Sequence, residues 1–169
     1  MPTLLAAAGV PDVKEKLLAG YKAGDKTFKV HLDGYNLLPF FKGEVKESPR
    51  KEMLYWSDDG GLMALRYGNW KAVFQEQRAE SFQVWSEPMV ELRVPKIFNL
   101  RSDPFERADH SSIYYNDWLL RRVFLLVPAQ GFVARWIQSF REFPPSQKPA
   151  SFNLTQVMEK LEAAGQKAK

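Results

Sequence analysis

The sequence predicts an α+β fold in which a small antiparallel sheet of four strands is accompanied by a long helix. Three strand-like runs, at 52–57, 62–67 and 70–76, follow one another with short connections, and a fourth short run lies at 96–100. Between about 112 and 143, large apolar residues recur at spacings of three and four, which is the period of an amphipathic helix. Both patterns are long enough to bury a core in a chain of 169 residues.

The connections between the first three runs predict hairpin turns. Asp59-Gly60-Gly61 lies between the first two runs, and Gly68-Asn69 lies between the second and the third. Asp-Gly and Gly-Asn favour tight hairpin turns because those turns need positive φ at their central residues. The stretch 52–76 is therefore expected to form an antiparallel meander.

The amino-terminal segment predicts short elements. Residues 2–8 form an apolar helical stretch that Gly9 and Pro11 end. Two interpretations stay open: a helix whose beginning precedes Met1, or a short terminal helix. Asp12 is placed to begin a second short helix, and the alternation in 27–32 predicts a strand.

Proline and glycine mark the later boundaries. Pro88 excludes a central strand within the irregular stretch 82–94. Asp103 followed by Pro104 predicts a tight turn that leads into a helix. Pro128 and Gly131 lie inside the apolar stripe, so we expect either a kinked helix or two consecutive helices there.

The end of the chain predicts a proline-rich linker and a terminal amphipathic helix. The stretch 143–151 has the composition of a polyproline II segment. Asn153 is placed to begin the helix, and Gly165 to end it.

Composition excludes several classes of protein. Lys and Arg number 24 and Asp and Glu 20, giving a net charge of +4. The basic residues alternate with acidic ones instead of gathering, so we expect no nucleic-acid partner. No apolar run reaches the ~18 residues of a membrane span. The absence of cysteine excludes disulfides, thiolate metal sites and a cysteine nucleophile.

No catalytic or metal-binding motif is present. His31 and His110 are the only histidines, and they lie too far apart for the spacings of a metal motif. Phosphate-binding glycine loops and the nucleophile elbow are also absent. From the residues alone, we expect a small α+β domain without an active site.

Four segments together resemble one family. They read MPTLLAAAGVP (1–11), LDGYNLLPFFKG (32–43), LRYGNWKAVF (65–74) and IFNLRSDPFERAD (97–109). Their order and spacing resemble the carboxy-terminal third of type I sulfatases, the arylsulfatase branch of the alkaline phosphatase superfamily. The remaining tail is similar to that of the larger bacterial arylsulfatases.

The resemblance implies a four-stranded sheet with a long packed helix, appended to a catalytic domain that hydrolyses sulfuric esters. Calcium and formylglycine are implied for the full-length member, in the part that would precede Met1. The formylglycine motif [C/S]-x-P-x-R is absent here, since cysteine is missing and Ser48-Pro49-Arg50 has the wrong spacing. We therefore expect no catalytic residue, metal or cofactor in this chain, and no activity from it alone.

The resemblance also divides the chain and suggests its partners. Residues 1–50 correspond to the tail of the catalytic domain with its connecting loops, 51–143 to the subdomain, and 144–169 to the linker and terminal helix. The expected partner is the missing catalytic domain, or a second copy that covers its docking surface. The alternative is an independent module that binds carbohydrate or protein. A periplasmic and a cytoplasmic bacterial location both stay open. Five residues are expected to line the substrate entrance: His31, Asp33, Tyr35, Tyr67 and Trp70.

Overall fold

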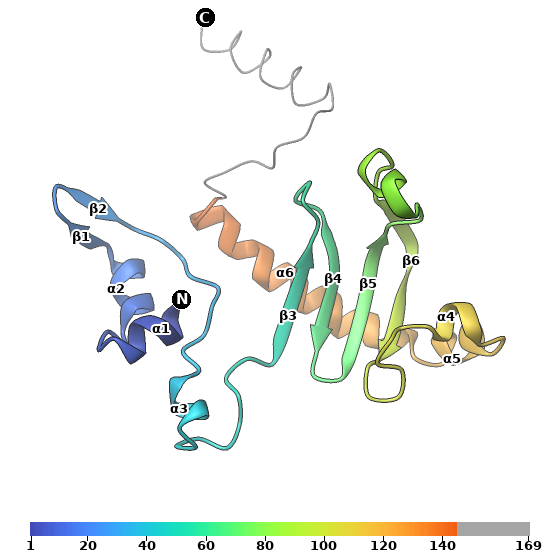
Figure 1. Cartoon of the computed structure of the whole chain (residues 1–169), viewed down its shortest axis with the longest axis horizontal. Coiled ribbons are helices and arrows are strands. Elements are labelled where there is room, and N and C mark those ends of the chain that lie inside the picture. Colours follow the sequence, from blue (N-terminus) through green and yellow to red (C-terminus); the bar gives the residue numbers. More distant parts are fainter. Residues whose placement is uncertain (145–169) are drawn as a thin grey trace, which may run out of the picture.

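The computed structural model describes residues 1–144, and a four-stranded antiparallel sheet forms its centre (Figure 1). Its strands, in spatial and chain order, are β3 (Glu52–Trp56), β4 (Leu62–Tyr67), β5 (Trp70–Glu76) and β6 (Val90–Asn99). Gly60 and Gly68 adopt φ of 80° and 57° in the two tight turns, which glycine does without steric cost. The predicted meander is confirmed, and β4 and β5 have the predicted bounds.

Strand β6 begins at Val90, six residues before the run at 96–100 that the sequence predicts, and it therefore includes Pro95. Val73 pairs with Lys96 and Gln75 pairs with Glu91, so the register of β6 shifts around the proline. A proline is tolerated here because β6 is an edge strand and the pairing is already interrupted. The irregular stretch before it contains the short 3₁₀ helix η1 (Ser81–Trp85).

The predicted helical stretch is divided into consecutive helices. They are α5 (Tyr115–Leu120), the 3₁₀ turn η2 (Val123–Leu125) and α6 (Leu126–Glu142). The break lies at 121–122 and not at Pro128, which occupies the first turn of α6. The missing N–H of a proline costs little there, because the first N–H groups of a helix have no intrahelical partner.

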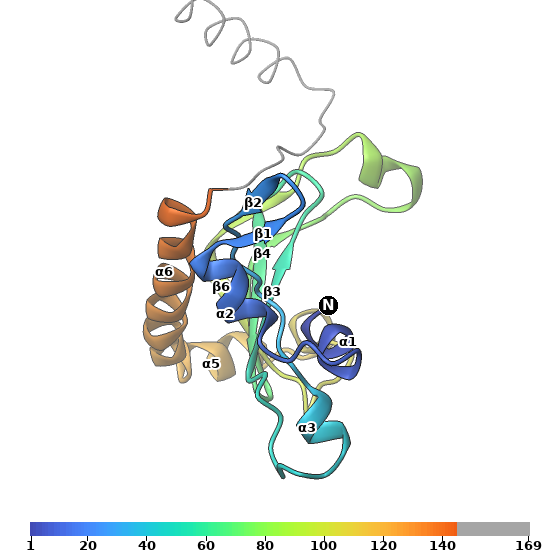
Figure 2. The same cartoon turned by 90° about the vertical axis from the view of Figure 1, so that its left-hand side faces the viewer.

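Helix α6 lies across one face of the sheet (Figures 1 and 2). Aromatic pairs join the two layers: Trp56 with Trp136 at 5.3 Å between ring centroids, and Tyr67 with Phe132 at 6.1 Å. These contacts place the helix over β3 and β4. The predicted α+β architecture of a four-stranded antiparallel sheet with a long helix is confirmed.

The best-buried cluster lies at the β6 edge, where Ile97 and Phe98 pack with Tyr115 and Leu119. The backbone N–H of Ile97 donates to the Tyr115 hydroxyl at 3.2 Å, and that hydroxyl donates to the Ile97 carbonyl at 3.0 Å. Tyr115 thereby satisfies both edge groups that no further strand pairs.

The amino-terminal segment lies beside β3 (Figure 1). Its elements are α1 (Pro2–Ala7), α2 (Val13–Ala19), β1 (Tyr21–Ala23), β2 (Lys26–Phe28) and α3 (Leu38–Phe41). Both predicted helices are confirmed. The predicted strand at 27–32 is mostly wrong, because β2 ends at Phe28 and pairs in a small hairpin with β1, which the sequence reading missed. Thr3 ties the segment together, accepting from the Leu37 N–H at 3.1 Å and donating to the Tyr35 carbonyl at 3.0 Å.

The predicted linker and terminal helix fall at 145–169, outside the described residues, apart from the first positions of the linker. Within residues 1–144, no helix combines the length and apolar character needed to cross a membrane.

Candidate functional site

The structure divides the five predicted substrate-entrance residues into separate groups. His31 and Asp33 lie together, with Nδ1 and Oδ1 3.1 Å apart. The His31 ring also contacts Phe143, just after α6, at 5.6 Å between centroids. This pair therefore lies where the amino-terminal segment meets the end of the long helix.

Tyr35 connects the amino-terminal segment to the sheet. Its hydroxyl donates a hydrogen bond to the carboxylate of Glu52 at the start of β3. This bond, followed by burial, raises the pKa of Tyr35 to about 12. The ring also lies under two cations, with Lys14 Nζ at 5.2 Å and the Arg50 guanidinium at 5.7 Å from its centroid.

Tyr67 and Trp70 lie together because the Gly68-Asn69 turn makes them cross-strand partners. Both line an apolar cavity of about 510 Å³ between the sheet and α6. Its walls are mostly aliphatic and aromatic, and Arg135, Lys51 and Glu52 are its charged residues.

A second cavity, of about 590 Å³, lies where α3 and the following loop face the ends of β3 and β4. We call it the basic cavity, and its charged residues are Lys46, Glu47, Arg50, Lys51, Glu52 and Arg66. Tyr67 belongs to both cavities. The sequence reading missed the four cations, because they alternate with acidic residues along the chain. A sign that could have found them is the run 42–51, which supplies most of the cations from one loop.

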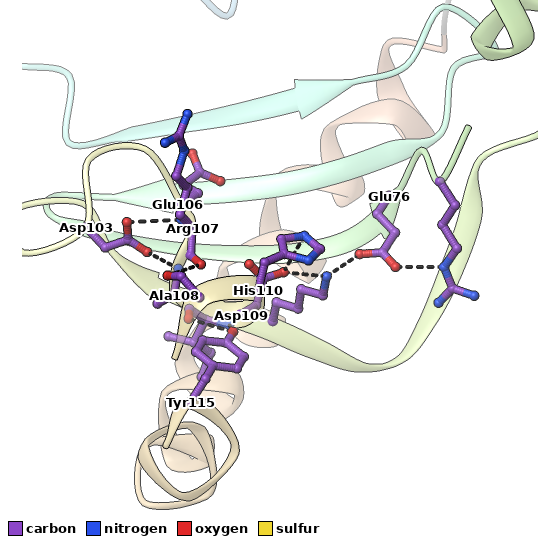
Figure 3. Close-up of polar contacts among 12 residues, drawn as sticks. Glu76, Asp103, Glu106, Arg107, Ala108, Asp109, His110 and Tyr115 are labelled. Carbon is purple, nitrogen blue, oxygen red and sulfur yellow. Dashed lines mark hydrogen bonds and ion pairs between the residues drawn. The ribbon is translucent and has the colours of Figure 1, made fainter. Parts of the chain in front are cut away.

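On the face of the sheet opposite α6, a polar network holds the segment 103–110 (Figure 3). Lys96 Nζ lies 2.5 Å from a Glu76 oxygen and 2.7 Å from Asp109 Oδ2. Lys71 Nζ lies 2.8 Å from Glu106 in a second ion pair. Two lysines of adjacent strands thus bind two carboxylates of one turn.

The network shifts the pKa values of Lys96 and Glu76. Burial opposes the charge of Lys96, but the hydrogen bonds to Asp109 and Glu76 outweigh it and raise the pKa of Lys96. The hydrogen bond from Lys96 lowers the pKa of Glu76, against a smaller effect of burial. Asp109 Oδ1 is buried and has no hydrogen-bond partner among the described residues. The directions of both pKa shifts, upward for Lys96 and downward for Glu76, favour the charged forms of this ion pair.

Asp103 shapes the same turn, as the sequence predicted. Its two carboxylate oxygens accept the N–H groups of Arg107 at 3.1 Å and Ala108 at 2.9 Å, at the start of α4 (Ala108–Ser111). Glu106 adopts a φ of 55°, an unusual conformation for a residue with a side chain. The ion pair with Lys71 and the bonds to Asp103 hold the turn in place.

Residues 1–144 contain no group of three or more His, Asp or Glu side chains that could hold a metal ion. The resemblance implies that the calcium of a full-length member is bound by the part that would precede Met1.

Large apolar side chains stay exposed between positions 105 and 124. We call them the 105–124 surface, and its members are Phe105, Ile113, Tyr114, Leu120 and Phe124. Ile113 is 88% exposed, although it lies between the two ordered helices α4 and α5. A second exposed pair, Phe82 and Trp85, lies in η1.

Among the comparisons with known proteins, only the comparison with solved structures finds a similar protein. No protein-family model matches the sequence, and no curated protein does. Among solved structures, the chain is similar to the PsFucS1 sulfatase from Pseudoalteromonas sp., with 21% sequence identity over 60% of this chain and a TM-score of 0.43. The matched part is 19% of the length of that sulfatase, so this chain spans about a fifth of it.

Proposed function

We propose that this chain is the carboxy-terminal subdomain of an arylsulfatase-like sulfuric ester hydrolase. It supports a catalytic domain, lines part of the substrate entrance, and has no hydrolytic activity alone. The four sequence segments in family order support the assignment. The structural observation that carries it is the amount of apolar surface that the described residues leave uncovered.

Few residues of the described part are buried. Eight hydrophobic residues make up its core, and Ile97 is the largest fully buried side chain. By contrast, the 105–124 surface exposes five large apolar side chains within twenty positions. Exposed large apolar side chains favour association, because burying each of them is worth about 1.5–3 kcal/mol. This surface is therefore proposed to dock on the catalytic domain.

The proposal assigns a role to each part of the chain. Residues 1–50 form the tail of the catalytic domain, 51–143 the subdomain, and 144–169 a linker and terminal helix. The Tyr35–Glu52 hydrogen bond and the Lys29–Glu142 ion pair support a fixed position of the first part beside the second.

The substrate entrance is proposed at the predicted residues. Tyr67 lines both cavities and Trp70 lines the apolar one, while His31 with Asp33 lies near the end of α6. Aromatic rings at a loop on a rigid sheet are suited to contact the organic part of a substrate.

Light scattering with a hydrophobic-dye titration tests the docking role. The full chain is expected to self-associate and to bind the dye. The variant Ile113→Ser/Tyr114→Ser should shift it toward monomer. The matched control Phe82→Ser/Trp85→Ser, which removes exposed apolar side chains from η1, should leave association unchanged. A monodisperse monomer that does not bind the dye would contradict the docking role. That result would favour the alternative, an independent module that binds carbohydrate or protein.

An activity assay tests the inactivity of the isolated chain. The chain is incubated with a standard aryl sulfate, with calcium and with a chelator. We expect no turnover in either case, since the described residues offer no metal site. Metal-dependent turnover that stays with the chain through purification would contradict the assignment.

A further inference from the structure

The basic cavity holds more positive charge than its own carboxylates neutralise. Four cations and two carboxylates line it. Glu47 is occupied by Lys51, at 2.5 Å, and Glu52 accepts the Tyr35 hydroxyl. Lys46, Arg50 and Arg66 have no carboxylate partner among the described residues. A ligand with negative charge is therefore favoured by three unneutralised cations that face one concave space.

Two of these cations are arginines whose guanidinium groups are only partly used. Arg66 Nε donates to the Gly68 carbonyl at 3.1 Å, and no ion pair engages the rest of that group within residues 1–144. The Arg50 guanidinium lies over the Tyr35 ring, which fixes its plane without using its N–H donors. A planar guanidinium binds a carboxylate or sulfate through two parallel hydrogen bonds.

The remaining lining determines which anionic ligand fits. Tyr67 is 54% exposed, and Phe40 offers a second aromatic side chain. Glu47, Glu52 and Asn69 add acceptors to the same walls. Carboxylates repel a densely charged polyphosphate, but they accept hydrogen bonds from hydroxyl groups. A ligand with a few anionic groups and many hydroxyls uses both the cations and the acceptors.

We propose that the basic cavity is a binding site for an anionic saccharide, one whose sulfate or carboxylate group pairs with Arg50 and Arg66. Its sugar ring stacks on Tyr67, and Lys46 closes the site from the loop. The volume of about 590 Å³ is larger than one small anion fills, which agrees with an oligosaccharide. This site shares Tyr67 with the proposed substrate entrance, but binding there requires neither a catalytic domain nor hydrolysis, so it is tested separately from the proposed function.

Isothermal calorimetry with the full chain tests the proposal with four probes. They are a sulfated heparin oligosaccharide, a carboxylated oligogalacturonate, a neutral cello-oligosaccharide and a single-stranded DNA oligonucleotide. We expect binding of one or both anionic saccharides and none of the neutral one. The first two probes distinguish sulfate from carboxylate as the favoured group.

Two matched variants locate the site. Arg50→Gln/Arg66→Gln should weaken binding of the anionic saccharide at least tenfold, since it removes two charge-assisted contacts. Arg93→Gln/Arg101→Gln removes the same charge from exposed positions outside the cavity and should change affinity less than twofold. Thermal unfolding is measured for each variant. If the first variant unfolds, Lys46→Gln in the exposed loop replaces it, with an expected loss of threefold or more.

Three results would overturn the proposal. Equal weakening by both double variants would mean diffuse attraction to a basic surface. Equal binding of the neutral saccharide would show that the cations are not used, and tighter binding of DNA would identify a nucleic-acid surface. Failure of all four probes to bind would also reject the site, while leaving the dye and light-scattering test of docking unaffected.

Discussion

Where the sheet meets α6 its best-buried side chains are apolar, whereas the opposite face carries two lysines that bind acidic partners from the 103–110 turn. Strand β6 shows the contrast in two neighbouring residues, since successive side chains of a strand point to opposite faces. Ile97 is 1% exposed and packs with Leu125 and Leu126. Lys96 is partly exposed and binds Glu76 and Asp109.

The difference shows that the two faces contribute differently: apolar burial on the α6 face stabilises the fold, and ion pairs on the opposite face position the turn. Burial on the α6 face stabilises in proportion to the apolar area removed from water, whatever the pH. On the opposite face, the cost of desolvating the charges offsets much of their attraction, so ion pairs add little net stability. They do select one position for the turn, because Lys71 and Lys96 each reach a different carboxylate on it.

The largest expected effect comes from the α6 face. Ile97→Ala should lower the free energy of unfolding by about 3 kcal/mol, since it removes buried methyl groups and leaves a cavity beside an existing one. Urea unfolding, followed by tryptophan fluorescence, measures the loss. The matched control is Ile113→Ala, at an 88% exposed position, which should change stability by less than about 0.5 kcal/mol. Equal losses at the two positions would mean that burial does not distinguish them.

Much of this sheet could be predicted from sequence, because its signals are local. Strand-like runs bounded by glycine turns define β4 and β5 to the residue. The first half of β6 could not be predicted, since Pro95 is acceptable only once the pairing with β5 is interrupted. Strand β1 has three exposed residues and therefore no apolar pattern. A proline in a first helical turn is neutral, so Pro128 did not mark the break.

The candidate site was predicted less well than the fold. Tyr67 and Trp70 come together because the two-residue turn that joins them is itself visible in the sequence. The basic cavity was not predicted, because its cations come from a loop and from β4, and only tertiary structure brings them to one wall. Along the chain they are separated by glutamates, which made the charge look dispersed.

An intermediate effect is expected on the opposite face. Lys96→Met should cost about 2 kcal/mol, because it leaves the buried Asp109 carboxylate with His110 alone, at 3.5 Å. In the double variant Lys96→Met/Asp109→Asn, the second change removes the unpaired charge. The loss of stability in the double variant should therefore be smaller, by about 1 kcal/mol, than the sum of the losses in the two single variants, Lys96→Met and Asp109→Asn. Urea unfolding of all four proteins measures this coupling, and simple additivity would mean that the two side chains act independently.

The smallest effect is a pH dependence of stability that arises from the face of the sheet opposite α6. Hydrogen bonds from Lys96 and Arg78 hold the pKa of Glu76 below its ordinary value. The unfolded chain therefore binds the Glu76 proton more readily, so the stabilisation is present above the unfolded pKa and is lost as pH falls through the folded one. Glu76→Gln should be less stable than the parent by about 0.5–1 kcal/mol at pH 7, and the gap should close below about pH 4. Glu91→Gln, at an exposed position without an ion pair among residues 1–144, should show no gap at either pH. If the stability difference between the parent and Glu76→Gln persisted at pH 3, Glu76 would stabilise the fold by packing and not by its charge. The two faces of the sheet would then be more alike than their charges indicate.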